Sequence, residues 1–167
     1  MDILNPVVKR WLDDAAADPD AFWARAAGRL HWFKQWDEAF IWEAPTYRWF
    51  AGGQTNISYN ALDFHVNRGW GDNCALIALD ERGGRRVYTY SELLAGVKAI
   101  AAALRGQGVQ RGDRVGIYMP TVAEAIMAML ACTRIGAVHI VVFAGFGSGA
   151  LSERLRLAGA KVLLAAD

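Results

Sequence analysis

Long hydrophobic runs and an excess of one charge are both missing from this sequence. The longest apolar run is AIMAMLAC at residues 125–132, far short of the roughly 20 residues needed to cross a bilayer. Lys and Arg total 18 against 17 Asp and Glu, without a basic cluster, so neither nucleic acid nor an anionic membrane has a charged surface to recognise. The start of the chain, MDILNPVVKRWLDDAAADPD, carries charges throughout, unlike a secretory signal peptide. We therefore expect a cytoplasmic protein with no membrane or nucleic-acid partner.

Cysteine and histidine are scarce as well. Cys74 and Cys132 both stand among apolar neighbours, which predicts buried, reduced thiols. The histidines are His31, His65 and His139, and no carboxylate or thiol joins them at ligand spacing, so we expect no metal site. His139 begins an apolar stretch and is predicted to be a hydrogen-bonded core residue.

Tryptophan is abundant but confined to one part of the chain. All seven tryptophans lie within the first 70 residues, whereas alanine, β-branched residues and glycine dominate afterwards. We predict an irregular, Trp-rich accessory segment at 1–70, without a core of its own, and an α/β subdomain at 71–167. Helices are expected near 6–16 and 20–28, the second capped by Asp18 ahead of a proline. Asp63 and His65 are predicted to pack this arm onto the sheet.

The second segment has a regular pattern of strands and helices. ALIAL and RRVYTY flank DERGG, which indicates a β-hairpin. Thr89 with Glu92 predicts a capping box for a helix that ends near Leu104, and Thr121 with Glu124 predicts a second one. In that second box Glu124 is interpreted as a cap and not as a catalytic acid.

Three apolar strands complete this segment. RVGIYM, AVHIVVF and KVLLAA alternate with helices, one ended by Gly136 and one begun by Ser148. Apolar runs without alternation indicate parallel strands covered on both faces. The fold class is thus α/β, with a hairpin followed by a parallel β-α-β-α-β unit. Arg154 and Arg156 are interpreted as solvated charges on the last helix.

The loop after the second parallel strand contains a possible nucleotide motif. Gly145, Gly147 and Ala150 fit G-x-G-x-x-A, and Asp167 follows at the spacing of a dinucleotide fingerprint. Phe146 lies inside the motif, and the first strand of such a unit usually carries it. An NAD(P)-binding Rossmann-type module is one hypothesis, and a plain strand-to-helix glycine loop is the other. The Trp-rich segment leaves a non-catalytic interaction domain as a further alternative.

Longer stretches of the sequence resemble a known enzyme family. YMPTVAEAIMAMLACTRIGAVHIVVFAGF (118–146), WFAGGQTNISYNALDFHV (49–66), the segment 88–120 and KVLLAAD (161–167) are similar, in order, to acetyl-CoA synthetases and their propionyl-CoA relatives. These are adenylate-forming acyl-CoA ligases. The resemblance implies a parent enzyme that uses ATP, Mg²⁺ and coenzyme A to convert acetate or propionate to acyl-CoA through an acyl-adenylate.

The resemblance also implies which residues bind the coenzyme. In the family a Phe-Gly-Gly-Phe segment lies beside the nucleotide end of coenzyme A, and Phe143, Ala144 and Gly145 match its first three positions. Ala144 replaces the family's first glycine. No glycine-rich phosphate loop ending in Gly-Lys occurs here, and the family's catalytic lysine lies much further along the chain. We therefore expect an N-terminal portion with no catalytic residue, inactive alone.

Overall fold

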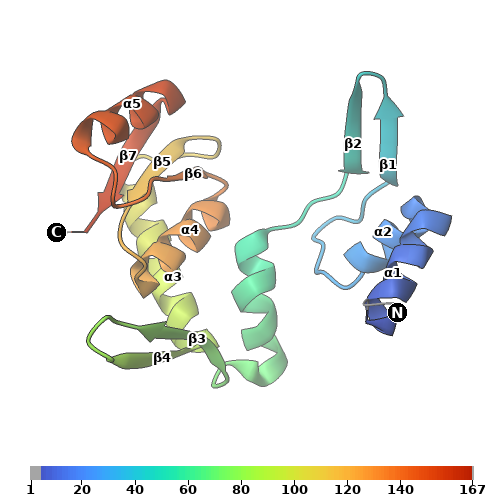
Figure 1. Cartoon of the computed structure of the whole chain (residues 1–167), viewed down its shortest axis with the longest axis horizontal. Coiled ribbons are helices and arrows are strands. Elements are labelled where there is room, and N and C mark those ends of the chain that lie inside the picture. The colour runs from blue at the N-terminus through green and yellow to red at the C-terminus, as the bar shows by residue number, and fades with distance from the viewer. Residues whose placement is uncertain (1–4, 167) are drawn as a thin grey trace. The chain divides into compact units, whose positions relative to one another are not determined.

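The computed structural model describes residues 5–166, which form two compact units at 5–55 and 56–166. Figure 1 shows the helices and strands of each unit. The units divide between Thr55 and Asn56, whereas the sequence analysis expected a boundary near residue 70. Asp167, the acidic end of the dinucleotide fingerprint, lies outside the described residues. No helix within residues 5–166 is long and apolar enough to span a bilayer.

The first unit contains two helices and a two-stranded sheet. Its elements are α1 (Pro6–Ala17), α2 (Pro19–Ala27), β1 (Glu38–Glu43) and β2 (Thr46–Ala51). The two predicted helices are confirmed. Asp18 caps α2, because its carboxylate accepts a hydrogen bond from the amide of Ala21 at 3.0 Å, satisfying a donor that has no partner inside the helix.

The hairpin β1–β2 corrects the expectation that this segment is irregular throughout. The strands are antiparallel, and Trp42 and Phe40 pair with Tyr47 and Trp49. The rings of Phe40 and Trp49 lie 4.5 Å apart, and those of Trp42 and Tyr47 are stacked at 6.4 Å. Cross-strand aromatic pairs stabilise such ladders. Alternate aromatic positions in FIWEAPTYRW were the signal for this hairpin, and the sequence analysis did not use it.

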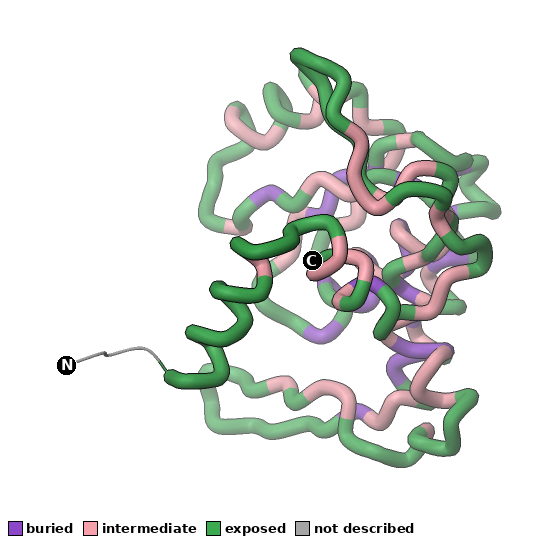
Figure 2. Tube along the Cα trace, turned by 90° about the vertical axis from the view of Figure 1, so that its right-hand side faces the viewer, coloured by how far each residue is buried: buried purple, intermediate pink, exposed green. Residues whose placement is uncertain are grey.

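Burial is concentrated in the second unit. Ala27 is the one described residue of the first unit that is buried, and the other buried residues belong to the second unit; Figure 2 colours the chain by burial. The first unit thus has aromatic contacts but very little core, as expected for a segment that cannot form a core alone.

The second unit begins with two short π-helical segments, η1 (Tyr59–Asp63) and η2 (Val66–Trp70). Its other elements are β3 (Cys74–Leu79), β4 (Arg85–Thr89), α3 (Tyr90–Gly106), β5 (Arg114–Tyr118), α4 (Ala123–Ile135), β6 (Val138–Val141), α5 (Ser148–Ala158) and β7 (Ala160–Ala165). β3 and β4 form an antiparallel hairpin, and the remaining strands form a parallel sheet in the order β6-β5-β7. The predicted hairpin and β-α-β-α-β unit are both confirmed.

The core lies where α3 and α4 pack against each other and against β5. Val97, Val115, Ala131 and Cys132 are completely buried there. β5 is the central strand and is covered on both faces, as predicted. The same prediction is wrong for β6 and β7, because Val138 and Val141 of β6 and alternate residues of β7 are exposed.

The two predicted capping boxes have different outcomes. Thr89 and Glu92 form the box at the start of α3, with both reciprocal hydrogen bonds present. The second box is wrong, because α4 begins at Ala123 and Val122 takes the N-cap position without a side-chain hydrogen bond. Glu124 therefore lies one position too early in the helix to close a box with Thr121, and it does not act as a cap.

The cysteines and His139 also differ from expectation. Cys132 is completely buried in α4, as predicted, and desolvation raises the pKa of its thiol to about 11. Cys74 is exposed at the first residue of β3, so the predicted burial is wrong. The buried Nδ1 of His139 has no hydrogen-bond partner among residues 5–166, which corrects its interpretation as a hydrogen-bonded core residue.

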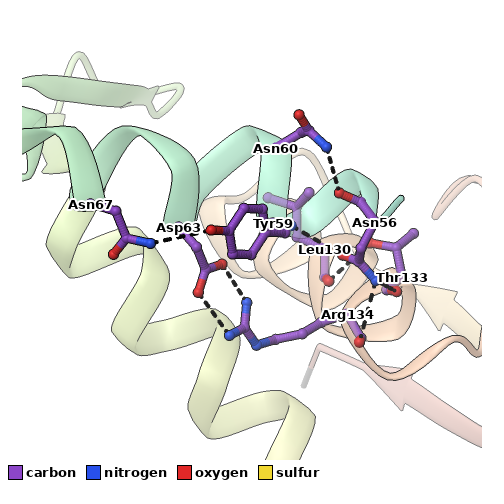
Figure 3. Close-up of polar contacts among 8 residues, drawn as sticks. All are labelled: Asn56, Tyr59, Asn60, Asp63, Asn67, Leu130, Thr133 and Arg134. Carbon is purple, nitrogen blue, oxygen red and sulfur yellow. Dashed lines mark hydrogen bonds and ion pairs between the residues drawn. The ribbon is translucent and has the colours of Figure 1, made fainter. Parts of the chain in front are cut away.

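A polar network fixes the start of the second unit to α4 (Figure 3). Arg134 donates two hydrogen bonds to the carboxylate of Asp63, at 2.6 and 2.9 Å. Asn56 donates from its amide to the carbonyl oxygen of Thr133 at 2.9 Å, one of the last carbonyls of the helix. Burial favours the neutral form of Asp63 and raises its pKa. The hydrogen bonds and positive charge of Arg134 have the larger combined effect, so the pKa of Asp63 is lowered.

His65 packs by ring contact close to the same network. Its ring lies 5.6 Å from that of Trp70 and 4.8 Å from that of Tyr90, the first residue of α3. Asp63 and His65 thus attach residues 56–70 to helices α4 and α3, and not to the sheet as predicted. The reason is that both π-helical segments lie against α3, while Asn56 and Asp63 bond to α4.

Candidate functional site

A cavity of the second unit has a volume of about 710 Å³. Three segments line it, within residues 78–88, 119–124 and 143–145. They belong to the hairpin β3–β4, to the connection from β5 to α4, and to the loop after β6. The last two follow the carboxyl ends of neighbouring parallel strands, which is where open α/β sheets bind their ligands.

The loop after β6 forms a turn along this cavity. The amide of Phe146 donates to the carbonyl oxygen of Phe143 at 3.0 Å. The Phe143 side chain is 73% exposed, and its ring folds over Gly145, where an added Cβ would lie 2.5 Å from the ring atom Cε1. Gly145 therefore has no space for a side chain while Phe143 keeps this position.

Tyr118 holds the turn from the end of β5. Its hydroxyl lies 2.9 Å from the carbonyl oxygen of Ala144 and 2.8 Å from that of Phe146. Both distances are within hydrogen-bond range, and the single hydrogen of the hydroxyl is shared between the two carbonyl oxygens. Tyr118 is not among the residues that line the cavity, so it acts on the site through the loop.

Arg154 of α5 supports the other side of the loop. Its guanidinium carbon lies 4.4 Å from the centre of the Phe146 ring, within the range of a cation–π contact. Arg154 is exposed, as expected for a solvated charge, and it also makes this ring contact, which the sequence did not predict. The contact arises because α5 starts directly after the loop and its first turns face back toward it.

The cavity carries charges of both signs. Asp80, Glu81 and Glu124 contribute carboxylates, and Arg85 and Arg86 contribute guanidinium groups. Asp80 already accepts hydrogen bonds from the amides of the hairpin turn, including that of Gly84 at 2.7 Å. Within residues 5–166 no three His, Cys, Asp or Glu side chains lie close enough together to hold a metal ion.

The structure brings the predicted residues Phe143, Ala144 and Gly145 together on one wall of the cavity. The sequence analysis missed Tyr118, Arg154 and the contribution of the hairpin. Tyr118 could have been found from its place at the end of a predicted strand, since strand ends carry binding residues in α/β folds. No sequence pattern of this kind indicates the contact of Arg154 with the Phe146 ring.

Comparisons with known proteins identify the family. Residues 62–167 match the family model described as "AMP-binding enzyme", and residues 8–61 match the one described as "Acetyl-coenzyme A synthetase N-terminus". The chain therefore belongs to the family of AMP-binding enzymes, and the predicted resemblance is confirmed.

Curated relatives agree with these two matches. The acetyl-coenzyme A synthetase of Deinococcus radiodurans is 54% identical over 149 residues, which is 89% of this chain and 23% of the relative. Those of Rubrobacter xylanophilus and Chlorobaculum tepidum are 49% and 47% identical, over 93% and 92% of this chain and 24% and 23% of the relatives. The chain thus spans about a quarter of their length. The matches do not favour a dinucleotide-binding module or a non-catalytic interaction domain.

Proposed function

We propose that the chain is the N-terminal part of an acid–CoA ligase. The enzyme converts a short-chain carboxylate, acetate or propionate, with ATP and coenzyme A to acyl-CoA, AMP and pyrophosphate. The single observation that carries this proposal is the 54% identity to an acetyl-coenzyme A synthetase across 89% of the chain. In this proposal residues 1–70 are an accessory segment, and residues 71–167 are an incomplete α/β subdomain of the AMP-binding large domain.

The proposed chemistry has two steps because a carboxylate is a poor electrophile. A carboxylate oxygen first attacks the α-phosphorus of ATP, which forms the acyl-adenylate and releases pyrophosphate. The thiol of coenzyme A then attacks the acyl carbon, loses its proton and releases AMP, leaving the thioester. We assign ATP and Mg²⁺ to residues outside this chain, and no residue of this chain is assigned a catalytic role.

Phe143, Ala144 and Gly145 are proposed to contact the nucleotide end of coenzyme A. Their turn lines the 710 Å³ cavity, and the exposed ring of Phe143 offers an aromatic surface beside it. The amides of Ala144 and Gly145 donate to no other described residue, so they are available to a ligand. The methyl group of Ala144, in place of the family's first glycine, leaves less space for the coenzyme to approach the backbone at that residue.

ATP–pyrophosphate exchange tests this function. The complete product of the source gene is expected to exchange pyrophosphate in the presence of acetate or propionate, whereas the 167-residue chain is expected not to. The second step is then measured as the formation of AMP and acyl-CoA after coenzyme A is added. Exchange by the 167-residue chain alone, or none by the complete product with either acid, would contradict the proposal.

A further inference from the structure

The turn that lines the cavity has few internal constraints. Its one internal backbone hydrogen bond runs from the amide of Phe146 to the carbonyl of Phe143. Phe143 is largely exposed, and Gly145 has no side chain that could anchor it. The hydroxyl of Tyr118 supplies the fixed point, since it reaches two carbonyls of the turn at 2.9 and 2.8 Å.

These two contacts determine the direction of two amide groups. In a trans peptide unit the C=O and the following N–H point in opposite directions. Holding the Ala144 carbonyl toward Tyr118 therefore turns the N–H of Gly145 away from Tyr118. The bond to the Phe146 carbonyl does the same for the N–H of Gly147, the N-cap residue of α5. Neither amide donates to another described residue, and Gly145 also lines the cavity, so its amide is left for a ligand.

We infer that Tyr118 is the positioning residue of the coenzyme A nucleotide subsite. It does not line the cavity, and it acts by presenting the amide of Gly145, which does line it, in a fixed orientation. The inference rests on the proposed function, because the coenzyme is the ligand that it assigns to the turn. Without the hydroxyl the turn samples other orientations, and the coenzyme must order it on binding.

The test is Tyr118→Phe in the complete ligase, which removes the hydroxyl and keeps the ring. Loss of one such hydrogen bond is expected to raise the KM for coenzyme A about three- to tenfold. The rate of ATP–pyrophosphate exchange should be unchanged, because adenylate formation precedes binding of the thiol. Tyr47→Phe is the matched control, since Tyr47 is 60% exposed in the first unit and should alter neither value.

A truncated acceptor makes the test specific to the nucleotide. Pantetheine carries the reactive thiol but lacks the nucleotide, so Tyr118→Phe should lower kcat/KM for coenzyme A and leave that for pantetheine unchanged. Three results would each overturn the positioning role: an unchanged KM for coenzyme A, an equal loss of kcat/KM for coenzyme A and pantetheine, or a parallel fall in the rate of ATP–pyrophosphate exchange. Absence of exchange in the unmodified ligase would instead overturn the proposed function, so the two failures are distinguishable.

Discussion

The ion pair between Asp63 and Arg134 offers the strongest test of how the second unit is stabilised. Two hydrogen bonds join the side chains at 2.6 and 2.9 Å, and the side chains of Asp63 and Arg134 are only 12% and 25% exposed. Asp63→Asn removes the negative charge while nearly preserving the shape of the side chain. The variant therefore isolates the electrostatic part of the contact.

The expected loss follows from the burial of the pair. Removing one partner of a fully buried ion pair costs about 3–5 kcal/mol, because the remaining charge stays without compensation. Here a quarter of the Arg134 side chain reaches water, and the asparagine oxygen still accepts one hydrogen bond. We therefore expect Asp63→Asn to lower the free energy of unfolding by about 2–4 kcal/mol.

Urea unfolding followed by circular dichroism measures this loss. With a slope of about 2 kcal/mol per M, the midpoint should fall by roughly 1–2 M. Asp113→Asn is the control in the same unit, since Asp113 pairs with Lys161 at 2.8 Å and these side chains are 26% and 45% exposed. Surface pairs stabilise little, so its shift should be much smaller. Equal shifts for the two variants would refute the reasoning.

Three further predictions concern pH, thiols and a helix end. The native pKa of Asp63 lies below its unfolded value, so the stabilisation is complete above the unfolded pKa and is lost as the pH falls through the native pKa. The free energy of unfolding should therefore decline less steeply with falling pH in Asp63→Asn than in the unmodified protein. Identical pH dependence in the two proteins would contradict this. Exposed Cys74 should react with a thiol reagent in the native protein, whereas buried Cys132 should react only in denaturant; two fast native thiols would refute this. Gly136 ends α4 with φ of 75°, so Gly136→Ala should cost about 1–2 kcal/mol in thermal unfolding. Gly106→Ala has open space around its Cβ and no positive φ, and it should be tolerated; equal losses for the two alanine variants would argue against backbone strain.

Local sequence patterns predicted most of the secondary structure. The T-x-x-E box at Thr89 set the start of α3, and Gly136 set the end of α4, because both act on backbone groups only a few residues away. The same spacing at Thr121 failed, since α4 starts one residue later than the pattern implies. The hairpin at 38–51 was missed because the uneven spacing of tryptophan over residues 1–70 was interpreted as irregular structure.

The candidate site was predictable only in part. Phe143, Ala144 and Gly145 follow a predicted strand and match a family segment, so the sequence indicated them as binding residues. Their partner Tyr118 lies 26 positions from Ala144. No pattern of local spacing connects these two residues, and the strand order β6-β5-β7 brings them together.

By itself the sequence determined the family, the α/β class and the order of its elements, because periodicity and turn residues act locally along the backbone. The tertiary structure alone decided which side chains meet. Asp63 reaches Arg134 across 71 positions, and Tyr118 reaches the turn after β6, because packing of helices and strands brings distant residues within hydrogen-bond distance. Such contacts depend on the arrangement of the whole unit, which local sequence patterns do not predict.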